Sequence, residues 1–418
     1  MEKLLIRGGK PLSGEVEISG MKNSALPVLF GTLTVGGICE IGNLPDLSDI
    51  SLSLEILRSL GAKVRMLDTD TVMIDTRPVT MKSPPLELVG KMRASTYLIG
   101  AMLARFSAAQ VGYPGGCDFG LRPINQHIKG FEMLGATITY GENANIVATA
   151  EQGLHGAQIY MDVVSVGATI NVMLAAVLAE GVTVIENAAR EPHIVDTACF
   201  LNACGADISG AGTGTIRIRG VKELHGCRYE LAPDMIEAGT YMVAAAATGG
   251  SVKVTKVIPK HMEAITAKLR EIGAQVVAED SAITVSATLP LRATSIKTNP
   301  YPGFPTDMHP QFSALLCLSS GMSAISEGVW GERFKYTAEL IKMGADIKVV
   351  ENTAYITGVP ELAGAEVAST DLRAGASLVI AGLAASGTTT VSGLEYLDRG
   401  YANIVDKLRA LGADIRRM

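Results

Sequence analysis

Apolar and polar positions follow the same order six times along the chain. Each copy is an amphipathic segment that ends in an apolar residue followed by Gly-Ala, and a short run of β-forming residues comes next. Such a copy predicts a helix that ends at a glycine with left-handed backbone, followed by a strand. In the last copy Val405, Leu408 and Leu411 form one apolar stripe, so that helix is expected to lie on a surface. The six glycines, about 70 residues apart, are Gly61, Gly135, Gly205, Gly273, Gly344 and Gly412.

Ahead of each amphipathic segment lies a second helical segment of a different character. Apolar and small residues cover nearly every side of it, as in "SVGATINVMLAAVLAEG" (165–181) and "DLRAGASLVIAGLAASG" (371–387). A helix without a polar face has to be enclosed by other elements. A TIM barrel, with outer helices and a repeat of about 30 residues, does not fit, and a six-unit solenoid would need polar capping repeats. We therefore predict an α/β (α+β) fold of two domains, each made of three repeated units around buried apolar helices.

Composition indicates an ordered globular protein and narrows the class of partner. Of 418 residues, 48% are hydrophobic and 19% are charged, which is enough apolar material for two sizeable cores. The net charge of −6 argues against binding to nucleic acid or to anionic lipid. The first residues lack the apolar core of a signal peptide, and the longest apolar runs fall short of the roughly 20 residues of a membrane span. We expect a soluble cytoplasmic protein with neither a nucleic-acid nor a membrane partner.

Polar and charged residues begin the apolar helical segments. Ser165, Asp234 and Asp371 are predicted to cap their helices, since short oxygen-bearing side chains accept hydrogen bonds from the first backbone N–H groups. Capping does not explain Lys22 or Arg93, because a cation at a helix start opposes the helix dipole. A bound anion would resolve that conflict, since helix N-termini and cations both favour it.

Further cations stand in glycine-rich or turn contexts. They are Arg122 in "GLRPINQ", Arg333 in "VWGERF" and Arg399 in "LDRGYAN", while Arg373 begins an apolar helix. Arg122, Arg333 and Arg399 are each, taken alone, most simply solvated surface arginines. Together with Lys22, Arg93 and Arg373 they suit a substrate that carries phosphates and a carboxylate, because arginine pairs with such groups through two parallel hydrogen bonds.

Six cysteines raise the question of disulfides, metal ligands and nucleophiles. None forms a CxxC pair, and a reducing compartment disfavours disulfides. Five are predicted to be small core residues, namely Cys39, Cys199, Cys204, Cys227 and Cys317. Cys117 differs, because glycines and prolines surround it in "VGYPGGCDFGLRPINQH" (111–127), so it is a candidate reactive thiol on a loop. Asp118 disfavours its thiolate and Arg122 favours it, so we hypothesise a thiol that keeps its proton until substrate is bound.

Several motifs, in order along essentially the whole chain, carry a resemblance to a known family. They are "SGMKNSALP", "KMRAST", "PGGCDFGLRP", "SVGATINVMLAA", "FPTDM", "GERF", "TDLRAGASL" and "DRGY". With these the chain resembles the UDP-N-acetylglucosamine 1-carboxyvinyltransferases, the enolpyruvyl transferases that open bacterial peptidoglycan synthesis. The resemblance implies an inside-out α/β barrel, with one domain of residues 22–232 and a discontinuous one of residues 1–21 plus 233–418. It also implies that no cofactor and no metal ion is needed, and it favours a monomer.

The resemblance further implies roles for individual residues, carried over motif by motif. Cys117 would protonate the methylene carbon of phosphoenolpyruvate, and Asp307 would accept the proton of the attacking 3-hydroxyl of UDP-N-acetylglucosamine. Lys22 and Arg399 are the further catalytic residues that it implies. The residues implied around phosphoenolpyruvate are Lys22, Asn23, Arg122, Arg333, Arg373 and Arg399. Those implied around the nucleotide sugar are Asn23, Arg93, Arg122, Pro123, Ile124, Asn125, Gln126, Val163, Val164, Ser165, Val166, Asp307 and the backbone near Val329.

Two other functions stay open beside this one. A sister enzyme of the same fold transfers the enolpyruvyl group to shikimate 3-phosphate, but it lacks the glycine-flanked cysteine loop and the "SVGATIN" segment. A non-catalytic sensor of the nucleotide sugar would not need the acid and the base that Cys117 and Asp307 supply. By the same resemblance, the epoxide antibiotic fosfomycin is expected to alkylate Cys117.

Overall fold

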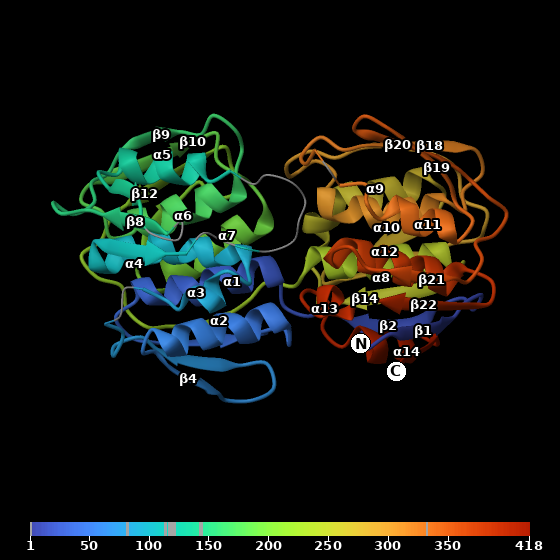
Figure 1. The fold of residues 1–418 in the computed structure, drawn as a ribbon, viewed down its shortest axis with the longest axis horizontal. Helices are drawn as coiled ribbons and strands as arrows, with labels where there is room; N and C mark the ends of the chain where they lie inside the picture. The colour runs from blue at the N-terminus through green and yellow to red at the C-terminus, as the bar shows by residue number, and fades with distance from the viewer. Residues whose placement is uncertain (1, 81–82, 113–114, 116–122, 142–144, 332) are drawn as a thin grey trace. The chain divides into compact units, whose positions relative to one another are not determined.

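The computed structural model describes residues 2–80, 83–112, 115, 123–141, 145–331 and 333–418, which form two compact units (Figure 1). Unit 1 contains residues 2–19 and 233–418, and unit 2 contains the described residues between Gly20 and Ala232. In Figure 1, unit 1 therefore combines the yellow-to-red part of the chain with the dark blue of its first two strands. Among the described residues, no helix has both the length and the apolar character of a membrane-crossing segment.

The described residues of unit 2 form three sheets, with strand orders β13-β3-β5-β4, β6-β8-β7 and β11-β12-β10-β9. Its strands are β3 (Ile38–Gly42), β4 (Lys63–Met66), β5 (Val72–Asp75), β6 (Ala108–Val111), β7 (Thr137–Tyr140), β8 (Ile146–Thr149), β9 (Gln158–Tyr160), β10 (Val182–Glu186), β11 (Asp207–Ser209), β12 (Thr215–Arg219) and β13 (Arg228–Glu230). Its helices are α1 (Lys22–Gly31), η1 (Thr32–Thr34), α2 (Ser48–Ser59), α3 (Leu86–Val89), η2 (Arg93–Thr96), α4 (Tyr97–Phe106), α5 (Asn125–Met133), α6 (Val166–Ala176) and α7 (Pro192–Ala203).

Unit 1 repeats this plan, with strand orders β21-β22-β1-β23, β15-β16-β14-β2 and β17-β18-β20-β19. Its strands are β1 (Leu4–Arg7), β2 (Ser13–Glu17), β14 (Ser251–Thr255), β15 (Gln275–Ala278), β16 (Ala282–Ser286), β17 (Ser295–Lys297), β18 (Met322–Ser326), β19 (Asp346–Val350), β20 (Thr353–Thr357), β21 (Glu366–Ala368), β22 (Thr388–Ser392) and β23 (Asp414–Arg417). Its helices are α8 (Met235–Ala247), η4 (Pro259–Met262), α9 (Glu263–Glu271), η5 (Thr306–Met308), α10 (His309–Leu316), α11 (Thr337–Lys342), α12 (Leu372–Ala384), α13 (Leu394–Leu397) and α14 (Ile404–Ala410).

The first strand of the chain completes a sheet made by the last strands. β1 lies between β22 and β23 and is antiparallel to both, with Ile6 opposite Thr389 on one side and Ile415 on the other. The two ends of the chain meet here, because Lys3 and Met418 exchange backbone hydrogen bonds of 3.0 and 2.9 Å. β2 is the edge strand beside β14 and runs parallel to it. Unit 1 is thus assembled from both ends of the chain.

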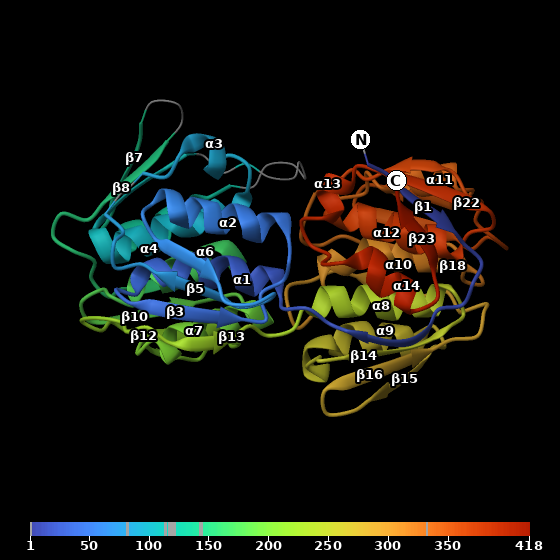
Figure 2. The same cartoon turned by 90° about the horizontal axis from the view of Figure 1, so that it is seen from below.

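The apolar helical segments form the centre of each unit, as predicted. In unit 1, α8, α10 and α12 pack against one another inside the sheets (Figure 2), and every residue of α8 is buried. In unit 2, α4 packs against α6 and α1, and α6 is buried from Ala168 to Ala176. Helices with no polar face are stable here because other helices and sheets cover all their sides.

The local signals of the repeat also hold. The six repeat glycines all have left-handed backbone, with φ between 92° and 105°, a conformation that side chains with a Cβ rarely adopt. The three predicted helix caps are present: Ser165 accepts from the backbone N–H of Ala168 at 3.3 Å, and Asp234 and Asp371 accept from two N–H groups each. Each cap satisfies donors that the helix itself leaves open.

The predicted burial of the cysteines is correct for three of them and wrong for one. Cys39, Cys204 and Cys317 are buried, and Cys227 is half-buried. Cys199 is exposed, since it lies on the outer face of α7, whereas its neighbours Ala198 and Phe200 point inward.

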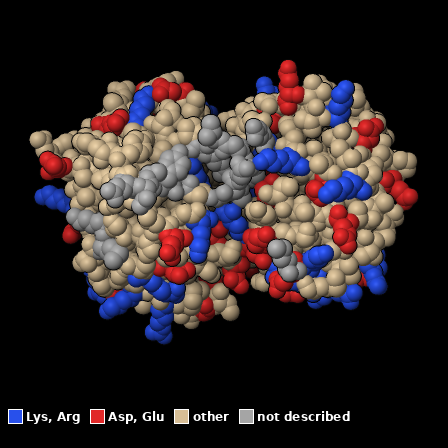
Figure 3. All heavy atoms as spheres, in the orientation of Figure 1, with Lys and Arg blue, Asp and Glu red and all other residues tan. Residues whose placement is uncertain are grey.

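Over the face of each unit seen in Figure 3, basic and acidic side chains are interspersed, as the small net charge suggests.

Candidate active site

A carboxylate held by two arginines lies at the inner helix ends of unit 1. Asp307 belongs to η5, at the start of α10, and its Oδ1 is 2.7 Å from Nη2 of Arg333. Its Oδ2 is 3.0 Å from Nη2 and 3.2 Å from Nε of Arg373, which lies in the first turn of α12. Both arginine side chains are only 4% exposed, whereas that of Asp307 is 28% exposed. The sequence separates these three residues widely, and the fold brings them together.

The arginines determine the protonation state of this carboxylate. Burial by itself would raise the pKa of Asp307, but the positive charges of Arg373 and Arg333 outweigh it and hold that pKa well below the usual range. Asp307 is therefore an anion at neutral pH. As long as both guanidinium groups hold it, it is also a weak base, because protonation would break two ion pairs.

Glu327, which sequence reasoning missed, fixes the segment that carries Arg333. Its carboxylate accepts hydrogen bonds from the hydroxyls of Thr298 and Thr306 at 2.7 Å each, and from the backbone N–H groups of Val329 and Trp330 at 2.7 and 3.1 Å. The Thr306 hydroxyl in turn accepts from Nη1 of Arg333 at 2.7 Å. The backbone N–H of Val329 is thus already used by Glu327. A single glutamate after a strand gave no sequence signal for this role.

A buried imidazole lies beside the same glutamate but is not charged. Nε2 of His309 is 3.6 Å from Oε2 of Glu327, and both side chains are fully buried. Burial, together with the charge of Arg333, lowers the pKa of His309 well below its ordinary value. The pair is therefore a contact between a neutral ring and a carboxylate. Because the His309 ring carries no positive charge, it does not compete with Asp307 for an ion pair.

Arg373 is held from its other side by an aromatic ring. Its guanidinium carbon lies 5.5 Å from the centroid of the Tyr401 ring, and the Tyr401 hydroxyl is 2.9 Å from that of Thr240 and 3.2 Å from Nε2 of Gln311. These contacts join α8, α10 and α12 below the arginine. Nη1 of Arg373 is buried and has no hydrogen-bond partner among the described residues. Arg399 is half-buried in the turn after α13, two residues before Tyr401.

In unit 2 the helix-start lysine has an anionic partner. Nζ of Lys22 is 2.7 Å from Oδ2 of Asp49, with both side chains nearly buried at 10% and 7% exposure. Asp49 lies in the first turn of α2, and Asn23, next to Lys22, is half-buried. The charge conflict that the sequence indicates at Lys22 is thus offset within the protein itself. Sequence reasoning missed Asp49, because an aspartate in the first turn of a helix is ordinary.

The Arg93 turn is attached to the inner helix α6. Asn171 of α6 donates to Nδ1 of His127 at 2.9 Å and to the carbonyl of Thr96 at 3.0 Å, and it accepts from the N–H of Gly100. Burial, with the charge of half-buried Arg93, lowers the pKa of His127 to about 3. The imidazole is therefore neutral, and its Nδ1 can accept the hydrogen bond from Asn171.

Gln126 and the 163–166 segment, both predicted for the nucleotide sugar, are brought together. The Gln126 side chain donates to Oδ2 of Asp162 at 3.1 Å and accepts from the Asp162 backbone N–H at 2.9 Å. Lys129 contacts the other oxygen of Asp162 at 2.7 Å. Val163 is 59% exposed, Val164 is 39% exposed, and half-buried Ser165 and Val166 begin α6. Pro123 and Asn125 are exposed and Ile124 is buried.

Each unit thus holds its own part of the predicted set. Unit 1 holds Asp307, Val329, Arg333, Arg373 and Arg399, and the other described candidates belong to unit 2. Two predicted residues, Cys117 and Arg122, lie outside the described residues.

Comparison with known proteins shows what this chain is similar to. The sequence model of EPSP synthase (3-phosphoshikimate 1-carboxyvinyltransferase) matches residues 6–408. The UDP-N-acetylglucosamine 1-carboxyvinyltransferase of Clostridium botulinum is 53% identical over 419 aligned positions, which cover all of both chains. The UDP-N-acetylglucosamine 1-carboxyvinyltransferase 3 of Caldanaerobacter subterraneus subsp. tengcongensis is 56% identical over 418 positions, again all of both.

Solved structures agree with the fold class. The enolpyruvyl transferase NikO from Streptomyces tendae superposes with a TM-score of 0.89 at 27% identity, over 100% of this chain and 99% of that one. EPSP synthase from Acinetobacter baumannii superposes with a TM-score of 0.76 over all of both chains, and at 20% identity this likeness concerns the fold alone. The predicted α/β class is therefore confirmed.

Proposed function

The chain belongs to the EPSP synthase family of enolpyruvyl transferases, and we propose on that premise that it acts on UDP-N-acetylglucosamine. It transfers the enolpyruvyl group of phosphoenolpyruvate to the 3-hydroxyl of this nucleotide sugar and releases phosphate, the first committed step of peptidoglycan synthesis. The observation that carries the choice of acceptor is the full-length identity of 53% and 56% to relatives with that name. The two alignments extend over both units, so they include every motif of the predicted site.

The proposed chemistry needs an acid and a base. Cys117 gives a proton to the methylene carbon of phosphoenolpyruvate, so that the central carbon becomes electrophilic. The 3-hydroxyl of the sugar attacks that carbon and gives its proton to Asp307. The product of this addition is a tetrahedral ketal. Phosphate then leaves, the methyl carbon returns a proton to the Cys117 thiolate, and the enolpyruvyl ether remains. Lys22, Arg122 and Arg399 bind the phosphate throughout, and their charges offset its own.

The pairing of Asp307 suggests an order for these events. While Arg333 and Arg373 hold Asp307, its pKa is too low for an effective base. The carboxylate of phosphoenolpyruvate competes for the same guanidinium groups, and Nη1 of Arg373, for which the described residues offer no hydrogen-bond acceptor, is one donor for it. When the substrate takes over these hydrogen bonds, the pKa of Asp307 rises toward its ordinary value. Binding of phosphoenolpyruvate thus prepares the base for the sugar hydroxyl.

The nucleotide sugar is assigned to Arg93, residues 122–126, residues 163–166, Asp307 and the backbone near Val329. Support comes from Gln126, whose amide fixes the residue before Val163 through two hydrogen bonds. Support also comes from Asn171, which holds the Arg93 turn against α6. Rigid placement of such segments keeps the acceptor hydroxyl oriented, which is the main gain expected from binding.

For the remaining properties we propose a cytoplasmic monomer that binds two small-molecule substrates. The proposed reaction needs no redox cofactor, because protonation, addition and elimination exchange no electrons with the protein. We also propose the domain division that the resemblance implies, with residues 22–232 in one domain and residues 1–21 plus 233–418 in the other.

Release of inorganic phosphate from phosphoenolpyruvate tests this proposal, with UDP-N-acetylglucosamine or shikimate 3-phosphate as acceptor. We expect release with the nucleotide sugar alone, and loss of release in Cys117→Ala. Release with shikimate 3-phosphate alone would identify the sister activity. Release with neither acceptor, despite binding of the nucleotide sugar in calorimetry, would identify a sensor.

A further inference from the structure

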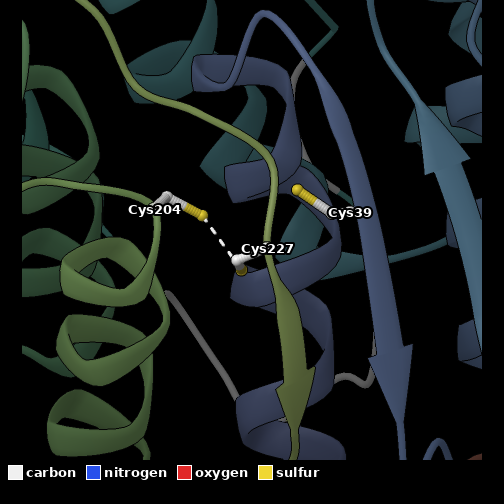
Figure 4. Close-up of side chains that lie close together, drawn as sticks. All are labelled: Cys39, Cys204 and Cys227. Carbon is white, nitrogen blue, oxygen red and sulfur yellow. Dashed lines mark hydrogen bonds between the residues drawn. The ribbon is translucent and has the colours of Figure 1, made fainter.

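Three cysteines from distant parts of the chain meet in unit 2, outside the candidate active site (Figure 4). Cys39 lies in β3, Cys204 follows the last residue of α7, and Cys227 directly precedes β13. Their three Sγ atoms all lie within 4.8 Å of one another, and those of Cys204 and Cys227 are 3.3 Å apart. In Figure 4, Cys39 and Cys204 point toward each other from opposite sides, with Cys227 next to them.

The backbone, and not only the choice of rotamers, brings the three residues together. β13 runs parallel to β3, and the N–H of Glu40 donates to the carbonyl of Cys227 at 2.9 Å. The N–H of His225 donates to the carbonyl of Cys204, also at 2.9 Å. These two bonds fix the ends of three segments beside each other, so the cysteines stay neighbours whichever way their side chains turn.

The same two backbone bonds recur in three other repeats, which gives an internal comparison. In one repeat the N–H of Val184 donates to the carbonyl of Ala157, and that of His155 donates to Leu134. In the next the donors are Ala324 and Arg292, and the acceptors are Thr294 and Ile272. In the last the donors are Thr390 and Ala363, and the acceptors are Ala365 and Met343. The residues that correspond to Cys39, Cys204 and Cys227 are therefore Thr183, Leu134 and Ala157, then Ser323, Ile272 and Thr294, then Thr389, Met343 and Ala365.

This comparison shows what is special about the cysteine group. In the other three repeats a long aliphatic side chain stands at the position of Cys204, and Leu134, Ile272 and Met343 are all fully buried there. In the cysteine repeat the shorter Cys204 takes that place, and the other two positions are small as well. In this repeat, three sulfur atoms thus lie around the space that one long side chain fills in the other three repeats.

We propose that Cys39, Cys204 and Cys227 bind one thiophilic metal ion, Zn²⁺ in the test below, with solvent as the fourth ligand at the half-buried Cys227. Zinc binds thiolates at about 2.3 Å, which in a tetrahedron places the sulfurs roughly 3.8 Å apart. The 3.3 Å between the Sγ atoms of Cys204 and Cys227 and the limit of 4.8 Å for all three pairs lie on either side of that value, so small side-chain rotations suffice. Each thiol loses its proton to solvent as its sulfur–zinc bond forms, and no atom changes its oxidation state. Soft thiolate sets select ions such as zinc over magnesium or calcium.

The bound ion would tie together β3, the end of α7 and β13, which are far apart in sequence. A ligand that binds the native state alone stabilises it in proportion to the logarithm of its concentration. With free zinc at about a hundred times the dissociation constant, the melting temperature should rise by about 5 °C or more. This inference does not rest on the proposed function, and enzyme activity is not one of its readouts.

The experiment uses the full-length protein, reduced and stripped of metal by a chelator under anaerobic conditions. Zinc is added in excess and the melting temperature is measured; unbound ion is then removed by gel filtration, and the bound metal is counted by mass spectrometry. We expect one zinc per chain and the increase in melting temperature, also in a Cys117→Ser background, where that thiol cannot contribute. Cobalt added in place of zinc should give a thiolate-to-cobalt charge-transfer band.

Two variants decide the location. Cys204→Leu introduces the residue type that other repeats carry at this position, so it should fold and lose zinc binding. Cys199→Ser is the matched control, since Cys199 is exposed on α7, the helix that ends directly before Cys204, and it should keep one zinc per chain. Less than about a tenth of an equivalent in the parent, or equal binding in Cys204→Leu, would overturn the proposal. A Cys204–Cys227 disulfide formed in air by protein that binds no zinc when reduced would overturn it too, in favour of a redox pair.

Discussion

The substitution Asp307→Asn tests whether the carboxylate that Arg333 and Arg373 hold is also the base of the reaction. The amide keeps the size of the side chain and one acceptor oxygen, but it cannot take the proton of the sugar hydroxyl. Turnover should therefore lose the contribution of general base catalysis, a factor of about 10² to 10⁴. The same substitution removes the anion that compensates the two arginines.

The effect on stability follows from the geometry. The contacts of 2.7 and 3.0 Å each correspond to roughly 6 kcal/mol of attraction at an effective dielectric constant of about 20, before desolvation is subtracted. Removal of one partner of a buried pair costs about 3 to 5 kcal/mol, and the lower value applies because asparagine keeps a hydrogen bond. For a unit of this size, about 3 kcal/mol lowers the melting temperature by about 6 to 12 °C.

The assay combines phosphate release with thermal melting. Phosphoenolpyruvate should raise the melting temperature of Asp307→Asn more than that of the parent, because it restores an anion to both arginines. Glu279→Gln is the control, since its ion pair with Lys253 is 2.8 Å long but exposed, so it should leave the melting temperature nearly unchanged and turnover unchanged. If Asp307→Asn kept kcat within about threefold of the parent, or melted like Glu279→Gln, the reasoning about Asp307 would be refuted.

Four further outcomes are expected. In the folded protein the pKa of about 3 keeps His127 neutral, whereas in the unfolded chain the same imidazole takes up a proton near pH 6.5. The free energy of unfolding should therefore fall by about 2 kcal/mol from pH 6.5 to 5, and urea titrations of His127→Gln should show a weaker dependence on pH. Asp49→Asn leaves the Lys22 ammonium buried without its carboxylate and should cost about 3 kcal/mol in urea unfolding, whereas a loss below about 1 kcal/mol would contradict a buried pair. The fluorescence of Trp330, whose backbone N–H donates to Glu327, should change when UDP-N-acetylglucosamine saturates the protein. An unchanged signal would contradict the placement of the sugar near Val329. Fosfomycin should add its mass to the parent but not to Cys117→Asp, and an adduct that persists in the variant would exclude Cys117 as its target.

The fold could be predicted because its signals are local and repeated. A Gly-Ala ending, an amphipathic stripe and an all-apolar helix each depend on neighbours within one or two turns, and the chain carries every signal six times. The caps at Asp234 and Asp371 were predictable for the same reason, since the acceptor and the donors are two or three residues apart.

The partners within the candidate site could not be predicted in the same way. Asp49, Asp162 and Glu327 act on residues that are far from them or that have no special spacing, and their residue types are common on any surface. The three-cysteine group could not be predicted for the same reason, since Cys39 and Cys204 meet only through the pairing of strand ends. Cys199 was misplaced because an apolar-looking helix segment still has an outer face.

The position of β1 between β22 and β23 has a consequence for synthesis on the ribosome. The strand that leaves the ribosome first must wait for the strands that leave it last, and at about 5 to 20 residues per second this delay is tens of seconds. During that time both edges of β1 lack their partners, which invites pairing with other nascent chains. Because Lys3 and Met418 exchange backbone hydrogen bonds, a gene rearranged to begin at residue 20 and to end with residues 2–19 would encode unit 1 as one continuous stretch. Such a permuted chain should aggregate less during expression at high rates of translation.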